Sequence, residues 1–337
     1  MENEKLLTVS SSPHIHSGNN ITTAMRDVAL ALLPATVLSV VYFGFYAVAI
    51  VLTAVVTAVV SEYVCQRIRK TDITIDDWSA ALTGLFVALL CPPTVPLWVV
   101  AIGSASAIVI GKQLFGGLGN NLFNPALIGR AVIGASWPVA MSGWVRPFDG
   151  VSTATPLALL TQYAGGGMFP TAASPMYGDW ISTLMENVPP LSALFLGNIA
   201  GSLGETSAAA LLLGGIYLIY RNHIDWKIPV LYIATVFVLM FIFNRGTDPL
   251  WHATYNILAG GLMLGAFYMA TDWVSSPITK HGRIIYALGL GLFTFLIRRG
   301  WGFPEGVLYS ILIMNMVTPM IDRYTKGRVF GAVKKNG

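Results

Sequence analysis

The sequence has few charged residues. Asp, Glu, Lys and Arg together form 11% of its 337 residues, whereas apolar residues form 55%. Soluble domains contain about 25% charged residues, so this composition excludes an ordinary soluble protein. The mean hydropathy of +0.66 points the same way. The composition therefore indicates a membrane protein.

Cysteine and the common catalytic motifs are also scarce. Cys65 and Cys91 lie in separate apolar segments, which supports neither a disulfide framework nor a CxxC metal site. No Ser-His-Asp, HExxH, P-loop or GxGxxG context is present. The first 27 residues lack the apolar stretch of a cleavable signal peptide, so we expect the first span to direct membrane insertion. We expect no metal site and no self-contained catalytic centre.

Apolar runs, separated by charges or by Pro and Gly, predict an all-α membrane protein with about ten spans. Several runs are shorter than the roughly 20 residues that a straight helix needs to cross. Short or Gly/Pro-interrupted spans are typical of half-helices that pack inside protein. The predicted spans lie near residues 28–43, 45–66, 78–91, 97–113, 125–141, 205–221, 228–243, 250–271, 284–298 and 306–321.

The basic residues predict the orientation of these spans. With the N-terminus inside, fifteen of the twenty Lys and Arg residues fall on the inner side, and only Arg146, Arg245, Arg298 and Arg299 fall outside. The positive-inside rule favours this orientation. We therefore expect a multi-pass protein of a prokaryotic cytoplasmic membrane, with both termini cytoplasmic. The net charge of +4 follows from this topology and gives no reason to expect nucleic acid as a partner.

Ten spans divide into five and five around a long outer loop, so the second half enters the membrane inverted. This is the inverted-repeat arrangement of many transporters, with a urea-transporter-like fold. Asp76-Asp77-Trp78 and Asp248 to Trp251 lead into short spans at matching positions. The expected parts are a leader (1–27), a first repeat (28–143), the outer loop (144–190), a second repeat (191–322) and a basic tail (323–337).

The outer loop contains a hydroxyl-rich run from Asp149 to Pro156. Thr155 is a good helix N-cap and Pro156 suits the first helical position, so the pair predicts the start of a helix through Tyr163. That structural role needs no function. The same helix end presents free N–H groups and a positive dipole, which also suits a phosphate esterified to the Thr155 hydroxyl.

The run Asp149 to Thr155 resembles the D-G-x-(S/T)-(S/G)-A-T pattern for covalent FMN attachment in the RnfD/NqrB family. The long N-terminal extension of NqrB is absent, so the RnfD branch is the closer match. Trp273 departs from the family, which usually has Pro after the Thr-Asp pair. Further segments similar to the family lie at Ser12 to His14, Lys112 to Gly117, Asn121 to Arg130, Gly201 to Ser207, Met269 to Asp272, Pro304 to Gly306 and Pro319 to Asp322.

The resemblance implies a specific function. The chain would carry FMN as a phosphoester on Thr155, attached by a flavin transferase that reads Asp149, Ser152, Thr153 and Ala154 on the outer side. It would be an electron-transfer subunit that acts with other subunits of an Rnf-type complex, coupling ferredoxin:NAD+ oxidoreduction to Na+ or H+ translocation. Some relatives also hold a non-covalent riboflavin.

Three further polar residues are candidates for the same chemistry. Glu205 opens a predicted span, where it either caps the helix through the dipole or contacts flavin or a cation. Thr271 and Asp272 lie at the inner end of another span. They either end that helix before Ser275-Ser276-Pro277 or, as the resemblance implies, line a flavin or ion path.

A second function fits the same predicted fold. Five-plus-five inverted repeats with half-helices also describe small-solute channels and transporters with a urea-transporter-like fold. The repeat pattern alone does not choose between a pore and an electron carrier. The outer loop favours the electron carrier. Flavin attachment requires the ordered run from Asp149 to Thr155, and a pore does not.

Overall fold

The computed structural model describes residues 20–165, 188–244, 248–300 and 305–326. Within these residues every regular element is helical, apart from one isolated antiparallel bridge between Val145 and Ser152. The expectation of an all-α chain is therefore confirmed for the described part.

Helices occupy each of the ten predicted apolar runs. The first half contains α1 (Ile21–Phe43), α2 (Phe45–Arg69), α3 (Ser79–Leu89), α4 (Leu97–Val109) and α5 (Pro125–Ser136). The second half contains α9 (Ala208–Tyr220), α10 (Lys227–Ile242), α11 (Pro249–Leu258), α12 (Leu262–Leu264), the π-helical turn η4 (Gly265–Met269), α13 (Lys280–Gly300) and α14 (Val307–Tyr324). Between the halves lie α6 (Pro156–Gly165) and α8 (Leu191–Leu196), and short turns are η1 (Ile75–Asp77), η2 (Gln113–Phe115) and η3 (Ala140–Ser142).

Among the described residues, three helical segments are long and apolar enough to cross a membrane on their own: α1, α2 and Leu97–Phe115, which joins α4 to η2. Several others are apolar but shorter, among them α3, α5, α9 and α10. The predicted continuous run at 250–271 is broken, because the chain leaves the helix at Ala259 and resumes at Leu262. Short and broken helices are thus a property of the described fold.

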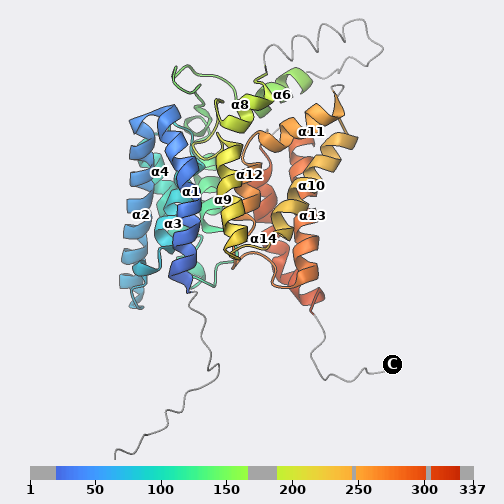
Figure 1. Cartoon of the computed structure of the whole chain (residues 1–337). Coiled ribbons are helices and arrows are strands. Elements are labelled where there is room, and N and C mark those ends of the chain that lie inside the picture. Colours follow the sequence, from blue (N-terminus) through green and yellow to red (C-terminus); the bar gives the residue numbers. More distant parts are fainter. Residues whose placement is uncertain (1–19, 166–187, 245–247, 301–304, 327–337) are drawn as a thin grey trace, which may run out of the picture.

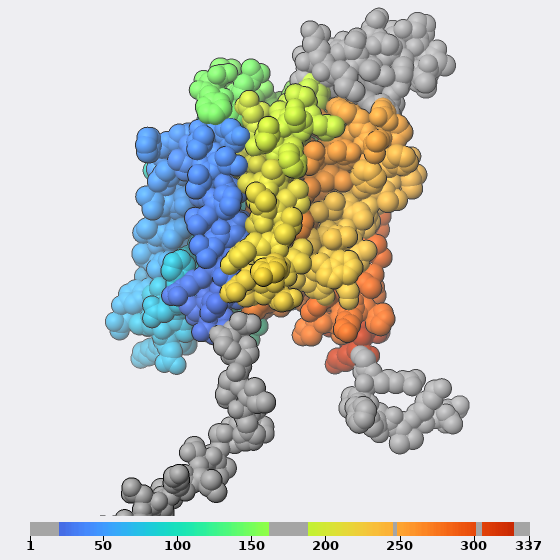
Figure 2. All heavy atoms as spheres, viewed as in Figure 1, coloured from blue at the N-terminus to red at the C-terminus, as the bar shows by residue number. Residues whose placement is uncertain are grey.

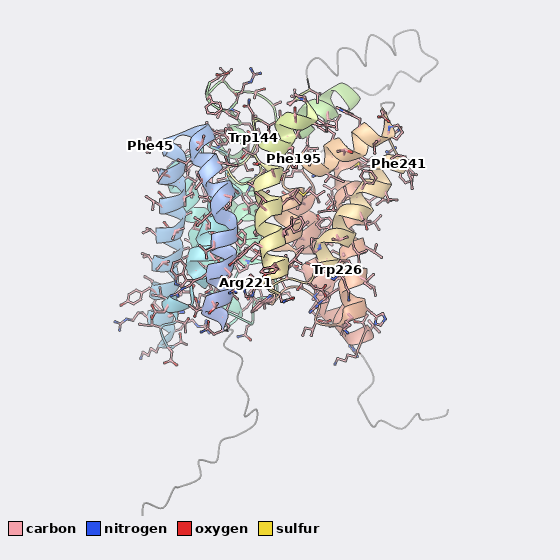
Figure 3. All side chains as sticks on the ribbon, in the orientation of Figure 1. Phe45, Trp144, Phe195, Arg221, Trp226 and Phe241 are labelled. Atoms are coloured by element: carbon pink, nitrogen blue, oxygen red, sulfur yellow. The ribbon has the colours of Figure 1, made fainter. Side chains whose placement is uncertain are left out.

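The helices form a bundle with two distinct ends (Figure 1). The start of α1 and the end of α14 lie at one end, and α6 and α8 lie at the other. Figure 2 shows the first half beside the second, with α9 between them on this face. In Figure 3, Phe45, Trp144 and Phe241 lie toward the end with α6 and α8, whereas Arg221 and Trp226 lie toward the opposite end.

The same order of helix contacts recurs in the two halves. In the first half α2 packs against α3 and α4, and α4 packs against α5. In the second half α10 packs against α11 and α13, and α13 packs against α14. The halves meet where α1 packs against α9.

The contact between α1 and α9 requires a glycine. A Cβ on Gly214 in α9 would overlap both the Ala31 carbonyl oxygen and the Tyr268 hydroxyl. That hydroxyl donates to the carbonyls of Ala31 (3.2 Å) and Leu211 (3.0 Å). Small residues let membrane helices approach this closely. The junction of the two halves therefore depends on Gly214.

We expect Gly214→Ala to destabilise the protein, because the added methyl overlaps backbone that has no room to move. Overpacking of this kind costs about 1–3 kcal/mol or more. The matched control is Gly201→Ala, since a Cβ on this buried glycine has no atom within 4 Å. Thermal unfolding in detergent should show a lower midpoint for Gly214→Ala only, and equal midpoints for both variants would contradict the close contact.

Candidate functional site

The hydroxyl-rich loop folds as a tight hairpin before α6. The Arg146 N–H donates to the Val151 carbonyl (2.8 Å), and the Thr153 N–H donates to the Trp144 carbonyl (3.1 Å). Gly150, with φ of +65°, makes the turn. The tip, including Asp149, is exposed to solvent. The loop therefore presents Asp149 outward.

Thr155 has the predicted capping role. Its hydroxyl accepts a hydrogen bond from the Ala158 N–H (3.2 Å), and Pro156 is the first residue of α6. The other residues of the predicted attachment run differ in exposure: Ser152 is exposed, whereas Thr153, Ala154 and Thr155 are half-buried. Among residues 149–156, only Thr155 and Pro156 line the neighbouring cavity. The sequence thus predicted the cap correctly, and the structure adds where the hydroxyl lies.

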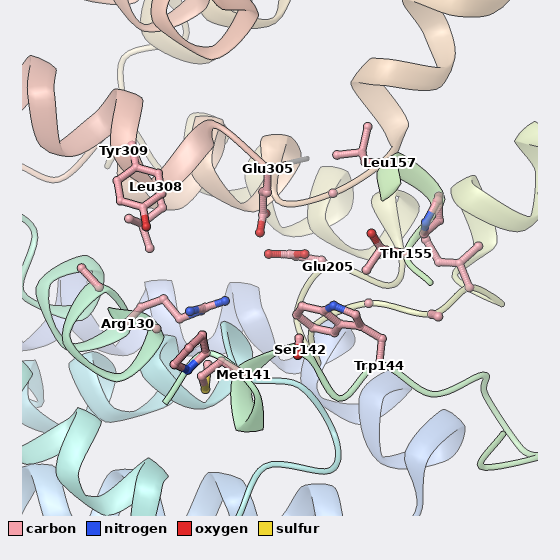
Figure 4. Close-up of a pocket in the computed structure, with 18 residues that line it drawn as sticks. Arg130, Met141, Ser142, Trp144, Thr155, Leu157, Glu205, Glu305, Leu308 and Tyr309 are labelled. Atoms are coloured by element: carbon pink, nitrogen blue, oxygen red, sulfur yellow. The ribbon is translucent and has the colours of Figure 1, made fainter. Parts of the chain in front are cut away.

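That cavity has a volume of about 350 Å³ and lies between the two halves of the bundle. Its wall is made by α5, the loop after it, the start of α6, the segment before α9 and the start of α14. Figure 4 shows Arg130, Trp144, Thr155, Glu205 and Glu305 around it. The cavity therefore brings together two of the predicted site residues, Thr155 from the loop between the halves and Glu205 from the second half.

Two helices end inside the bundle near this cavity, and an arginine side chain donates to the last carbonyls of each one; Arg130 is half-buried and Arg298 is buried. Arg130 donates through Nε to the carbonyl of Leu90, just after α3 (3.0 Å). Arg298 donates to the carbonyls of Asn256 and Ala259, at the end of α11. The last carbonyls of a helix lack partners in the helix, and a cation there suits its negative dipole end.

The segment 197–207 lies beside the end of α3. Its Leu203 N–H donates to the Cys91 carbonyl (3.0 Å), and its Gly204 N–H donates to the Leu89 carbonyl (2.7 Å). These bonds satisfy backbone groups of an irregular segment that is buried among helices.

Glu205 does not cap α9. The cap is Ser207, whose hydroxyl accepts from the Ala210 N–H (3.3 Å). Glu205 precedes it, is 7% exposed and lines the cavity. The capping interpretation of Glu205 is therefore wrong, because Ser207 occupies the cap position and the Glu205 carboxyl lies beside Gly261.

Glu305 was not a candidate from the sequence, yet it lies in the same cavity. It lies two residues before the first residue of α14, and its Oε1 accepts from the Gly261 N–H (2.9 Å) at the break between α11 and α12. Its carboxyl faces that of Glu205 (Figure 4). The only signal in the sequence was an acidic residue beside a glycine at the start of a short span.

Thr271 and Asp272 lie apart from this cavity. They line a different one, of about 210 Å³, together with Tyr268 and Asn124. The Thr271 hydroxyl donates to the Phe267 carbonyl (2.7 Å), and Asp272 accepts from the Ser275 hydroxyl (2.9 Å). These bonds fit the helix-ending role, and the structure does not join the two residues to Thr155.

A buried ion pair lies elsewhere in the first half. The Lys112 ammonium is 2.7 Å from a Glu62 carboxylate oxygen, and both side chains are almost fully buried. Lys112 also donates to the Ser79 hydroxyl, and Gln113 donates to Glu62 (3.1 Å). Lys112 was counted among the inner-side charges and in a segment similar to the family, and neither observation predicted its burial.

We expect Lys112→Met to destabilise the protein strongly, because it leaves the Glu62 charge buried without its partner. Breaking such a pair costs about 3–5 kcal/mol. The double variant Glu62→Gln/Lys112→Met, which removes both charges, should regain most of the lost stability. Thermal unfolding of both variants measures this, and a double variant as unstable as the single one would contradict the pairing.

Comparison with known proteins identifies the family. The chain belongs to the NQR2, RnfD, RnfE family, whose profile matches residues 8–331. It is 45% identical to the D subunit of the proton-translocating ferredoxin:NAD(+) oxidoreductase complex of Clostridium ljungdahlii, with 97% of each chain covered. It is also 45% identical to the D subunit of the Na(+)-translocating ferredoxin:NAD(+) oxidoreductase complex of Acetobacterium woodii, with 98% of each covered.

A more distant relative has the same kind of name. The D subunit of the ion-translocating oxidoreductase complex of Halorhodospira halophila is 36% identical, with 96% of this chain and 95% of the relative covered. The predicted family is therefore confirmed. Because the two relatives at 45% identity are named for different ions, overall identity carries no information about the coupling ion.

Proposed function

We propose that this chain is the D-type subunit of an Rnf-type complex, an oxidoreductase that couples ferredoxin:NAD+ electron transfer to Na+ or H+ translocation. Relatives that align over nearly the whole chain are named as such subunits. The chain itself acts as an electron carrier within the complex, and its partners are the other subunits and the lipid membrane.

We further propose that the carrier is FMN, esterified through its phosphate to Thr155. The observation that carries this proposal is the position of the Thr155 hydroxyl, which lines the cavity while the hydroxyls of Ser152 and Thr153 do not. The volume of about 350 Å³ falls within the range of about 300–1,000 Å³ typical of ligand pockets. The residues present therefore fit a flavin nucleotide attached at this point.

The chain's own groups would hold the cofactor in distinct ways. The N-terminal end of α6 offers its N–H groups and positive dipole to a phosphate on Thr155. The Trp144 indole, beside Thr155 in Figure 4, supplies a flat apolar surface, and Leu157 excludes water from the same wall. The Arg130 guanidinium adds positive charge. When bound, FMN supplies reversible one-electron transfer.

The membrane arrangement that we propose has ten spans in two inverted repeats. The recurrence of helix contacts in the two halves and the helices that end inside the bundle from each half support it. The position of α6 opposite the start of α1 and the end of α14 agrees with a flavin loop on the outer side and both termini in the cytoplasm, as the positive-inside rule favours.

A small-solute channel is the weaker candidate. Its fold would also have short and broken helices, so the architecture does not separate the two functions. The relatives named above are oxidoreductase subunits, and a pore gives no reason for a threonine hydroxyl at a helix N-cap to line a cavity. Both observations favour the electron carrier.

We expect covalent flavin on Thr155 when the chain is produced with a flavin transferase. In-gel fluorescence after denaturing electrophoresis should show a band for the wild type, Ser152→Ala and Thr153→Ala, and none for Thr155→Ala. Thr155→Ser should keep fluorescence, because it retains a hydroxyl for the ester. The transferase must be shown to act on another target in the same cells.

A fluorescent Thr155→Ala band would move the attachment site to another residue. A dark wild-type band in the presence of an active transferase would contradict the proposal and favour the channel.

Asp149 should serve recognition by the transferase. It is exposed at the tip of the hairpin and is not part of the cavity wall, so Asp149→Ala should lower flavin loading without changing membrane insertion or thermal stability. The ratio of fluorescence to protein measures loading, with Arg146→Ala as the control at another exposed position of the same hairpin. Full loading of Asp149→Ala would show that the residue is not required.

A further inference from the structure

The carboxyl groups of Glu205 and Glu305 meet at Gly261. A Cβ on Gly261 would lie 2.5 Å from Oε1 of Glu305 and 2.8 Å from Oε1 of Glu205. Both oxygens therefore converge on the same small space, which only a glycine leaves free. The two glutamates come from the segment before α9 and from the residues just before α14, and their carboxyls face each other in Figure 4.

The nearby arginines do not pair with these carboxyls. Arg130 and Arg298 act on Glu205 electrostatically, but their hydrogen bonds go to the backbone carbonyls at the ends of α3 and α11. In the part of the chain that the structure describes, neither arginine forms an ion pair with Glu205 or Glu305. The other ionisable groups around them are Tyr232 of α10 and Tyr309 of α14.

We propose that Glu205 and Glu305 form a binding site for one proton, which the two carboxyls share. Two carboxylates in contact within a buried site cannot both stay ionised unless cations pair with them. One proton between them removes the repulsion and forms a hydrogen bond from the protonated carboxyl to the charged one. The remaining single charge is offset by the two arginines.

The surrounding groups suit a proton better than a metal cation. Na+ and other hard cations require several oxygen ligands. Around this pair the Gly261 N–H donates to Glu305, and two guanidinium groups repel a cation. The Ser202 hydroxyl, fully buried beside Glu205, has no hydrogen-bond partner at normal geometry. It is placed to donate a hydrogen bond to the Glu205 carboxyl.

The site would also be linked to the cofactor, and this step rests on the proposed function. Thr155 lines the same cavity as both glutamates. A phosphodiester on Thr155 adds one negative charge, and electron transfer to the cofactor adds another. Each added negative charge favours the protonated pair, so the shared proton would be held up to a higher pH. The proton affinity of the pair would thus depend on the charge of a group attached to Thr155.

Infrared spectroscopy of the full-length chain in lipid nanodiscs tests the shared proton. The unloaded wild type at neutral pH should show a carboxylic-acid carbonyl band that shifts in D2O. Glu205→Gln and Glu305→Gln should each remove this band completely, because one remaining carboxylate beside two arginines stays ionised. The double variant should remove no more than either single variant. Asp272→Asn, which changes a carboxyl outside the cavity, should leave in place the band that the two glutamate variants remove.

Two outcomes would overturn the shared proton. If each single variant removes half of the signal, the two carboxyls are protonated independently. If neither single variant removes any of the signal, both carboxyls are ionised in the wild type.

A titration of the wild-type chain gives a second measurement that needs no glutamate variant. With flavin loaded, the band should disappear at a pH higher by about 1 unit or more, the size expected for one nearby charge. Thr155→Ala should titrate like unloaded protein whether or not the transferase is present. An unchanged titration in protein with verified loading would contradict the linkage.

The infrared measurements distinguish failure of the flavin attachment from failure of the shared proton. If flavin is not attached to Thr155, the band sensitive to the Gln variants remains and only the loading shift is lost. If the shared proton is wrong, that band is absent in loaded and unloaded protein alike.

Discussion

Helix ends inside the bundle are the constraint on which the rest of this structure depends. Lipid offers no hydrogen bonds, so a helix that stops within a membrane protein must find partners for its last carbonyls in the protein itself. Here α3 stops at Leu89 and α11 at Leu258. Arg130 and Arg298 supply the donors. The positive charge of these two arginines then influences which groups are stable beside them.

The cavity follows from these two helix ends. Since α3 and α11 stop short, space remains between the halves, and the segment 197–207 enters it and bonds to the end of α3. This placement buries Glu205 opposite Glu305 and beside the start of α6. An irregular backbone that lines a cavity at such a position is typical of binding sites in membrane proteins with interrupted helices.

The sequence predicted the helices well because their signals are local. Apolar runs bounded by charges or by Pro and Gly coincide with α1 to α5 and α9 to α14, and Thr155-Pro156 was sufficient to predict the cap of α6. The break at Ala259 to Gly261 was missed, because small residues barely lower the hydropathy of a run. Likewise, counting charges assigned Arg298 and Lys112 to the two membrane surfaces, although both are buried.

The site was predicted only in part for the same reason. Thr155 and Glu205 were candidates, but nothing local shows that they share a cavity. Glu305 and the roles of Arg130 and Arg298 depend on contacts between residues about 40 positions apart, such as Arg130 with Leu90 and Glu305 with Gly261. Such contacts are set by where α3 and α11 end, which the sequence pattern does not fix to within a turn.

A density map of the assembled complex would show directly where the flavin is attached. Attachment at Thr155 predicts density that continues from the Thr155 hydroxyl oxygen into the cavity bounded by Trp144, Arg130 and the Glu205–Glu305 pair. Density that continues instead from Ser152 or Thr153, or a flavin ring that lies outside this cavity, would contradict it.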